Sequence, residues 1–157
     1  MVISYLSELV PPEAGRIVRV GGGPEIRRRL VDMGVVAGAV VEVERVAPLG
    51  DPVEIRVKGY DLALRKEEAK KIQVEVIRGS LARVAAGEKV VIVGVRAGWG
   101  LQRRLADLGL TPGTVVGMVN SGCPGQVVLE VRGSRLAIGH GVADKIIVRP
   151  EKVELGD

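Results

Sequence analysis

The spacing of hydrophobic residues predicts a short helix followed by several short strands. Ile26, Leu30 and Met33 fall at positions i, i+4 and i+7, which is the apolar stripe of a helix. Pro24 suits the first turn of this helix, and Gly34 suits a left-handed cap at its end. Beyond Gly34, apolar and polar residues alternate, as is typical of half-buried strands. Strands are expected at residues 41–44, 53–58 and 62–64 and, outside that run, at residues 16–20 and 72–76.

The whole pattern occurs a second time. The motif Arg-Arg-Leu-x-Asp-x-Gly occupies residues 28–34 and again residues 103–109, an offset of 75 residues. Further along, Val57-Lys58-Gly59 aligns with Val131-Arg132-Gly133 at an offset of 74, which indicates one deletion near residues 47–52. The glycines of these two tripeptides lie between apolar runs and predict hairpin turns. Chance similarity would not keep this register, so we infer two homologous modules.

The repeat divides the chain into residues 1–77 and residues 78–157. A period of this length is too long for a solenoid and suits two small domains. About five short strands with one helix between the first and second strands are typical of a small, partly open β-barrel. The chain has no Phe, and only 2% of its residues are aromatic, so each interior must be aliphatic. A core this small leaves no room for a substrate, and we expect the modules to act through their surfaces.

Several segments now carry a resemblance to a known family. The helix motif at residues 28–34 is followed by Ala47-Pro48-Leu49-Gly50-Asp51-Pro52-Val53-Glu54-Ile55 and by Gly59-Tyr60-x-Leu62-x-Leu64-Arg65. In this order the segments resemble the ferrous iron transport protein A (FeoA) family over the whole first module. The second module keeps the helix motif and Leu110-Thr111-Pro112-Gly113, but has Asn120-Ser121-Gly122-Cys123-Pro124-Gly125 in place of the loop. The chain therefore resembles a tandem of two FeoA-like domains.

The resemblance implies a fold class and a function. The fold is mainly β, with two tandem SH3-like small barrels. The function is that of a non-enzymatic accessory protein of ferrous iron transport, whose partner is the cytoplasmic part of the FeoB-type membrane transporter. A location in the cytoplasm, at the inner face of the membrane only through that partner, follows from the same resemblance. The family's kinship with the C-terminal domain of diphtheria-toxin-repressor-type regulators leaves two alternatives, a metal-responsive regulatory module and a divalent transition-metal-binding protein.

The expected contact surface for the transporter lies mainly in the first module. It combines Pro48, Leu49 and Asp51 of the loop with Met33 at the end of the helix and Tyr60 in the hairpin. We select these residues because only the first module retains the family-like loop. One module would then bind the partner while the other supports it.

Trp99 is the single tryptophan and lies between two glycines in the second module. Aromatic residues dominate interface hot spots, so Trp99 is a candidate anchor for a partner. We favour packing against the other module, because an exposed tryptophan lowers solubility.

The net charge is +4, and the excess of cations lies entirely in the second module. A basic protein invites a nucleic-acid interpretation, but successive helix residues point about 100° apart, so Arg27, Arg28 and Arg29 form no single patch. The chain also lacks an aromatic stacking platform, and the pattern does not favour nucleic acid. We interpret the arginines as a solvated face. Arg28 and Arg29 recur as Arg103 and Arg104, which indicates a shared structural task, either pairing with Asp32 and Asp107 or capping the helix.

Chemistry-bearing residues are few. One cysteine, Cys123, cannot form an internal disulfide, and one histidine, His140, cannot build a His/Cys metal cluster. A Cys/His pair without a third group does not define a catalytic centre, so we predict no catalytic, cofactor or tight metal site. Weak binding of Fe²⁺ or another divalent ion through His140 and carboxylates stays open, as does homo-oligomerisation. No apolar stretch approaches the ~20 residues that span a bilayer.

Overall fold

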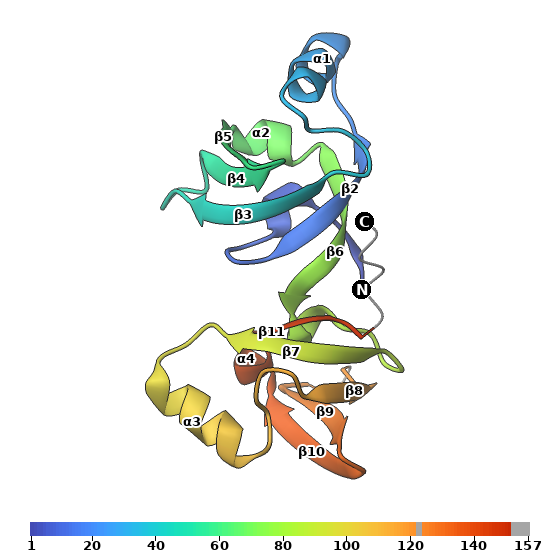
Figure 1. The fold of residues 1–157 in the computed structure, drawn as a ribbon, viewed down its shortest axis with the longest axis vertical. Helices are drawn as coiled ribbons and strands as arrows, with labels where there is room; N and C mark the ends of the chain where they lie inside the picture. Colours follow the sequence, from blue (N-terminus) through green and yellow to red (C-terminus); the bar gives the residue numbers. More distant parts are fainter. Residues whose placement is uncertain (122–123, 152–157) are drawn as a thin grey trace. The chain divides into compact units, whose positions relative to one another are not determined.

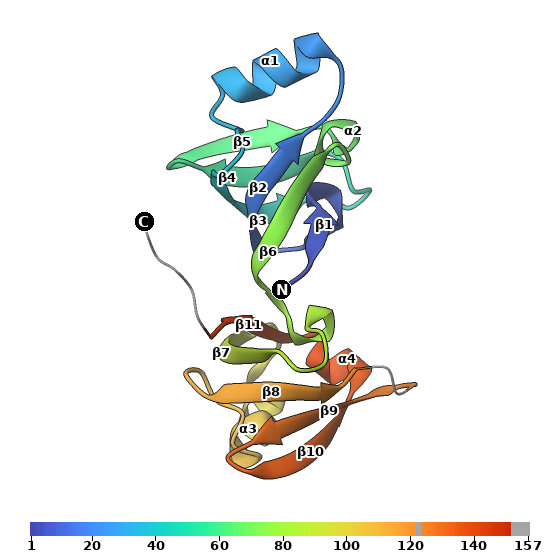
Figure 2. The same ribbon diagram turned by 90° about the vertical axis from the view of Figure 1, so that its right-hand side faces the viewer.

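The computed structural model describes residues 1–121 and 124–151. The chain divides into two compact units. The first unit is Val2–Ile77, and the second unit is Arg78–Asp157 together with Met1. The boundary falls within one strand, β6 (Ile72–Ser80). Figure 1 and Figure 2 show a curved array of strands in each unit, and β6 belongs to the strand order of both.

The first unit contains five strands besides the start of β6. They pair in the order β6-β2-β3-β4-β5, and β1 pairs antiparallel with β6 off this path. The elements are β1 (Ile3–Tyr5), η1 (Leu6–Glu8), β2 (Ala14–Val20), α1 (Pro24–Asp32), β3 (Val40–Val46), β4 (Val53–Val57), β5 (Tyr60–Leu64) and α2 (Lys66–Ala69).

The second unit repeats this order, and the end of β6 takes the place of β1, since Gly79 and Ser80 pair with β11 as Ser4 and Tyr5 pair with β6. Its strands pair in the order β10-β9-β8-β7-β11, and the end of β6 pairs with β11. The elements are η2 (Leu81–Arg83), β7 (Lys89–Val95), α3 (Trp99–Asp107), β8 (Val115–Asn120), β9 (Gln126–Val131), β10 (Ser134–Gly139), α4 (His140–Ala143) and β11 (Ile146–Pro150).

Both cores are aliphatic, as the composition predicts. In β4 the inward-facing residues alternate with more exposed ones, so Val53, Ile55 and Val57 are buried while Arg56 faces solvent. Each long helix contributes one fully buried side chain, Leu30 in α1 and Leu105 in α3. The second core gathers Leu81, Val84, Val90, Ile92, Leu105, Leu110, Val116, Met118, Val127, Leu129, Val131, Ile138, Ala143, Ile146 and Val148.

Local irregularities also repeat between the units. The register of β3 against β4 shifts between Val43 and Arg45, and that of β8 against β9 shifts between Met118 and Asn120, at the matching position. A β-bulge places two residues opposite one and bends its strand. The two units therefore share the device that curves the sheet, and not only the order of elements.

The β9–β10 hairpin turn offers a test of local backbone strain. Arg132 has a φ of 51° and Gly133 a φ of 80°, and the equivalent turn in the first unit has the same signs. Positive φ at both residues is the pattern of a type I′ turn, for which Asn-Gly is preferred. We therefore expect Arg132→Asn to stabilise the second unit by about 0.5–1 kcal/mol. An unchanged or lower midpoint in urea unfolding would contradict this account, and Gly133→Ala should shift the midpoint the opposite way.

The predicted fold class is confirmed, with additions. Helix and strand positions agree with the hydrophobic pattern, although β2 begins at Ala14 and not at residue 16. The sequence missed β1, both η helices, α2 and α4, because segments of three or four residues are too short for periodicity to emerge. Because β1 comes first, α1 lies between the second and third strands of its unit.

Candidate functional site

The loop of residues 47–52, between β3 and β4, presents a leucine at its tip. Leu49 is 92% exposed, and Pro48 beside it is also exposed. The loop is tightened by a hydrogen bond of 2.7 Å from the backbone N–H of Gly50 to the carbonyl of Ala47. The apolar tip is thus held on a short, closed loop and stays accessible to another molecule.

Asp51 connects this loop to the neighbouring helix. Its Oδ1 accepts a hydrogen bond of 3.1 Å from the backbone N–H of Lys66, the first residue of α2. Carboxylates suit this position because the first N–H groups of a helix lack partners within the helix. The structure therefore gives Asp51 a role in positioning the loop, while its side chain remains exposed.

Met33 and Tyr60 lie at the other end of β4. Met33 is the partly buried C-cap of α1, and its successor Gly34 lies beside the side chain of Lys58 in the β4–β5 turn. Tyr60 is 67% exposed and pairs with Val57 across the hairpin. The helix end and the hairpin are therefore neighbours. The loop tip lies about 15 Å away along β4, at roughly 3.3 Å per residue.

An ion pair that the sequence analysis missed joins α1 to α2. The guanidinium of Arg29 contacts Oε2 of Glu68, and Oε1 of Glu68 accepts a hydrogen bond of 2.9 Å from the backbone N–H of Arg65. Glu68 is buried. Of the two roles expected for Arg29, pairing with Asp32 is therefore wrong, because a carboxylate from another element meets the guanidinium. In the second unit Val142 stands at the position of Glu68.

The outer face of β3, β4 and β5 carries a second charged group. Arg56 donates to Glu44 at 2.8 Å and to Asp61 at 3.0 Å, and Arg45 pairs with Glu54 at 2.7 Å. The sequence could have indicated these ion pairs, because residues of opposite charge at facing positions of paired strands are neighbours on one face of a sheet. In the second unit the equivalent pair is reversed, with Glu130 directly across from Arg135. The two outer faces therefore differ in where each charge lies.

This group predicts opposite titration of two carboxyls. The hydrogen bond from Arg56 lowers the pKa of Asp61 below 3.8, whereas desolvation raises the pKa of Glu44 above 4.5. Asp61 thus favours folding above its ordinary pKa and loses that contribution as pH falls, while Glu44 favours folding at low pH and loses it as pH rises. Carbon-13 NMR titration should show both shifts. Arg56→Ala should return the pKa of Asp61 towards 3.8. An unchanged titration midpoint of Asp61 in this variant would contradict the pairing.

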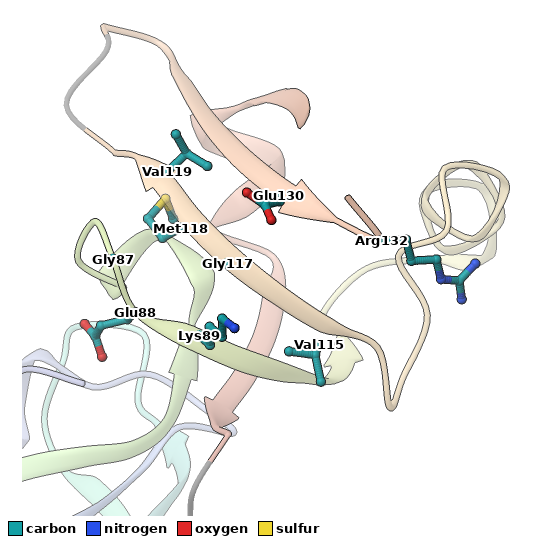
Figure 3. A pocket seen from close by; sticks show the side chains of 9 residues that line it. All are labelled: Gly87, Glu88, Lys89, Val115, Gly117, Met118, Val119, Glu130 and Arg132. Carbon is teal, nitrogen blue, oxygen red and sulfur yellow. The ribbon is translucent and has the colours of Figure 1, made fainter. Parts of the chain in front are cut away.

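The second unit has a shallow groove of about 300 Å³ over its sheet (Figure 3). Gly117 of β8 is paired with Lys89 of β7 on one side and with Glu130 of β9 on the other. The missing side chain of Gly117 leaves a hollow between a cation and a carboxylate, with Val115 and Val119 along the same strand. The sequence pattern gave no sign of this groove.

Trp99 is exposed within the second unit. It begins α3 and is 72% exposed, and the guanidinium carbon of Arg103 lies 5.2 Å from the centre of its ring. The ring is therefore not part of the second unit's core, and its packing against the other module stays a prediction. Glycines on both sides and a position in the first helical turn direct the ring into solvent, where a cation–π contact holds it. This exposed aromatic ring remains available as an anchor.

The residues that could hold a metal ion lie apart in residues 1–121 and 124–151. Within these residues no three His, Cys, Asp or Glu side chains lie close enough to hold a metal ion. His140 begins α4 and is exposed, and Cys123 lies outside the described residues. In the same ranges no helix has the length and apolarity to cross a membrane.

Each unit is mainly β and repeats the same antiparallel strand order, with one longer helix after its first long strand, so the chain is a tandem of SH3-like modules. The family model of the FeoA domain matches residues 5–76 and again residues 79–150. The chain therefore belongs to the FeoA domain family, once in each unit.

The chain is similar to the following proteins and solved structures. The Fe(2+) transport protein A/Fe(2+) transporter FeoB fusion protein of Porphyromonas gingivalis is 40% identical over 85 residues, which are 54% of this chain and 10% of that protein. The iron(II) transport protein A of Clostridium thermocellum has a TM-score of 0.56 and 32% identity, covering 98% of this chain and 91% of that one. A FeoA-like protein of Clostridium acetobutylicum is 38% identical, covering 48% of this chain and 88% of its own, with a TM-score of 0.45.

Proposed function

We propose that the chain is a cytoplasmic, non-enzymatic accessory protein of ferrous iron transport that docks onto the cytoplasmic part of a FeoB-type transporter. The observation that supports this proposal is that, in the Porphyromonas gingivalis protein, a region similar to this chain is fused to an Fe(2+) transporter. Fusion raises the effective concentration of one domain around the other, which promotes binding only if the two domains contact each other. We expect this chain to have a surface that makes the same contact.

The first unit offers the better docking surface. Leu49 on its closed loop and Tyr60 on its hairpin are exposed apolar groups on rigid supports. The second unit has Ser134 at the position of Tyr60, and Leu108, which is 50% exposed, at the position of Met33. The aromatic contact is thus specific to the first unit. Trp99 supplies a separate anchor on the second unit, since tryptophan is enriched among residues that dominate binding energy.

The proposal is tested with single substitutions on the full chain. Leu49→Ser and Tyr60→Ser should each weaken binding to the purified cytoplasmic part of the transporter by roughly tenfold or more, the effect of removing an interface hot spot. Surface plasmon resonance of the full chain over the immobilised transporter domain measures this. Circular dichroism of each variant checks that the fold is retained.

A matched variant separates docking from loss of apolar surface. Leu108→Ser removes an exposed leucine at the helix end of the second unit and should leave affinity unchanged. If Leu108→Ser and Leu49→Ser weakened binding equally, the loss of affinity would reflect nonspecific hydrophobic association. Unchanged affinity in Leu49→Ser, Tyr60→Ser and Trp99→Ser alike would overturn the proposed surface.

A further inference from the structure

A pocket of about 240 Å³ in the first unit is lined by three cations from separate parts of the chain. Arg19 comes from β2, and Lys70 and Lys71 follow α2. Tyr5 and Gln73 lie opposite each other on the paired strands β1 and β6 and complete the polar lining. The pocket is smaller than the roughly 300–1,000 Å³ typical of drug-sized ligands, so it suits a small group.

The charges in this pocket are not balanced by the surrounding protein. Lys70 pairs with the exposed Glu67 at 3.2 Å. Among the residues that the structure describes, Arg19 and Lys71 have no ion-pair partner, although the first module as a whole carries equal numbers of cations and anions. Like charges brought together repel one another, and a bound anion offsets that cost. The net positive pocket therefore indicates an anionic ligand.

Tyr5 adds a hydroxyl donor to the pocket. The side-chain amide of Gln73 donates a hydrogen bond of 3.2 Å to the Tyr5 hydroxyl oxygen. With the oxygen serving as acceptor, the O–H hydrogen points elsewhere and is available to a ligand oxygen. A neutral donor beside cationic donors is the arrangement that proteins use to surround oxyanions.

The glycine turn keeps the pocket open next to Lys71. Gly21 donates its backbone N–H to the carbonyl of Lys71 at 2.8 Å, which fixes the turn against the end of α2. Gly22 has a φ of +98°, and a Cβ there would come within 3.2 Å of Cδ of Lys71. A side chain at Gly22 would displace the lysine stem, so the glycine permits the lysine to line the pocket.

We infer that this pocket binds a phosphate-class oxyanion. Arginine and lysine are the side chains that bind phosphate oxygens most strongly, by charge-assisted hydrogen bonds, and the pocket has room for a phosphate group. The ligand is either a free phosphate compound or the headgroup of an anionic lipid, because both present the same chemistry.

The second unit provides an internal control, because it lacks most of these residues. Gly94 stands at the position of Arg19, Asp144 at that of Lys70 and Ile147 at that of Gln73. Lys145 is retained at the position of Lys71, and Arg96 replaces Gly21 of the open glycine turn. The inference therefore places the site in the first unit alone.

Amide NMR titration of the full chain with inorganic phosphate, at constant ionic strength, tests the inference. Saturable shifts are expected at residues 19–22 and 70–73, with none at the equivalent residues 94–97 and 144–147. Arg19→Ala and Lys71→Ala should each raise the dissociation constant by roughly tenfold or more, and Lys145→Ala should leave it unchanged. Tyr5→Phe, which removes only the hydroxyl, should raise it by roughly fivefold.

The opposite results overturn the inference. Chemical-shift changes that do not saturate, or that spread equally over both units, would show only general attraction of phosphate to cations. The same conclusion would follow if Lys71→Ala and Lys145→Ala weakened phosphate binding equally. Sedimentation with phosphatidylcholine vesicles containing phosphatidic acid identifies the source. Vesicle binding that Lys71→Ala abolishes indicates a lipid headgroup, and phosphate binding without vesicle binding indicates a soluble compound. Vesicle binding that Lys71→Ala does not change, without saturable phosphate binding, would also overturn the inference.

Discussion

Leu30→Ala and Leu105→Ala are each expected to destabilise their own unit by about 2–5 kcal/mol. Leu30 is the only buried side chain of α1 and Leu105 the only one of α3, and both are at most 2% exposed. Truncation removes the apolar contact that holds each helix on its barrel and leaves a cavity in a core with no aromatic residue to fill it.

Urea unfolding of the full chain, with amide hydrogen exchange to assign the loss to one unit, measures the effect. Val31→Ala is the matched control, because Val31 neighbours Leu30 in the helix but is 44% exposed. It should change the stability by less than about 0.5 kcal/mol. Faster amide hydrogen exchange throughout both units in either leucine variant would contradict the claim that the two cores are independent.

Glu68→Ala is expected to cost the first unit about 1–3 kcal/mol. The buried carboxylate of Glu68 accepts the backbone N–H of Arg65 at the start of α2 and contacts Arg29 of α1. Its removal leaves that N–H without its acceptor and separates the two helices. Glu68→Gln retains the acceptor and should cost less than the alanine variant.

The neighbouring Glu67 gives the control for this prediction. Glu67 is exposed and pairs only with Lys70 on the surface, so Glu67→Ala should be close to neutral. Thermal unfolding of the three variants ranks them directly. A ranking in which Glu67→Ala is as destabilising as Glu68→Ala would show that charge, and not the buried contact, sets the effect.

The sequence predicted what depends on local order along the chain. The apolar stripe through Leu30 located α1, and the repeated motif located α3, because helical periodicity is set by neighbours in sequence. Alternation located the strands, and Gly59 and Gly133 marked the hairpin turns. Even the position of the loop at residues 47–52 followed from the change of offset between the repeats.

Features that depend on distant residues were beyond such patterns. Arg29 meets Glu68 across 39 positions of sequence, so spacing could offer only pairing with Asp32 or capping of the helix. The exposure of Trp99 follows from where α3 begins on its barrel, which composition does not reveal. The cation pocket around Arg19 and Lys71 likewise requires β2 and the end of α2 to be neighbours, which only the fold establishes.

The central claim is that this chain docks onto the transporter. Isothermal titration of the full chain into the purified cytoplasmic part of a FeoB-type transporter tests it most directly. The account predicts saturable binding with a defined stoichiometry, weakened by Leu49→Ser and unaffected by Leu108→Ser. If the heat of binding does not saturate at micromolar to millimolar concentrations of the full chain, the claim is contradicted.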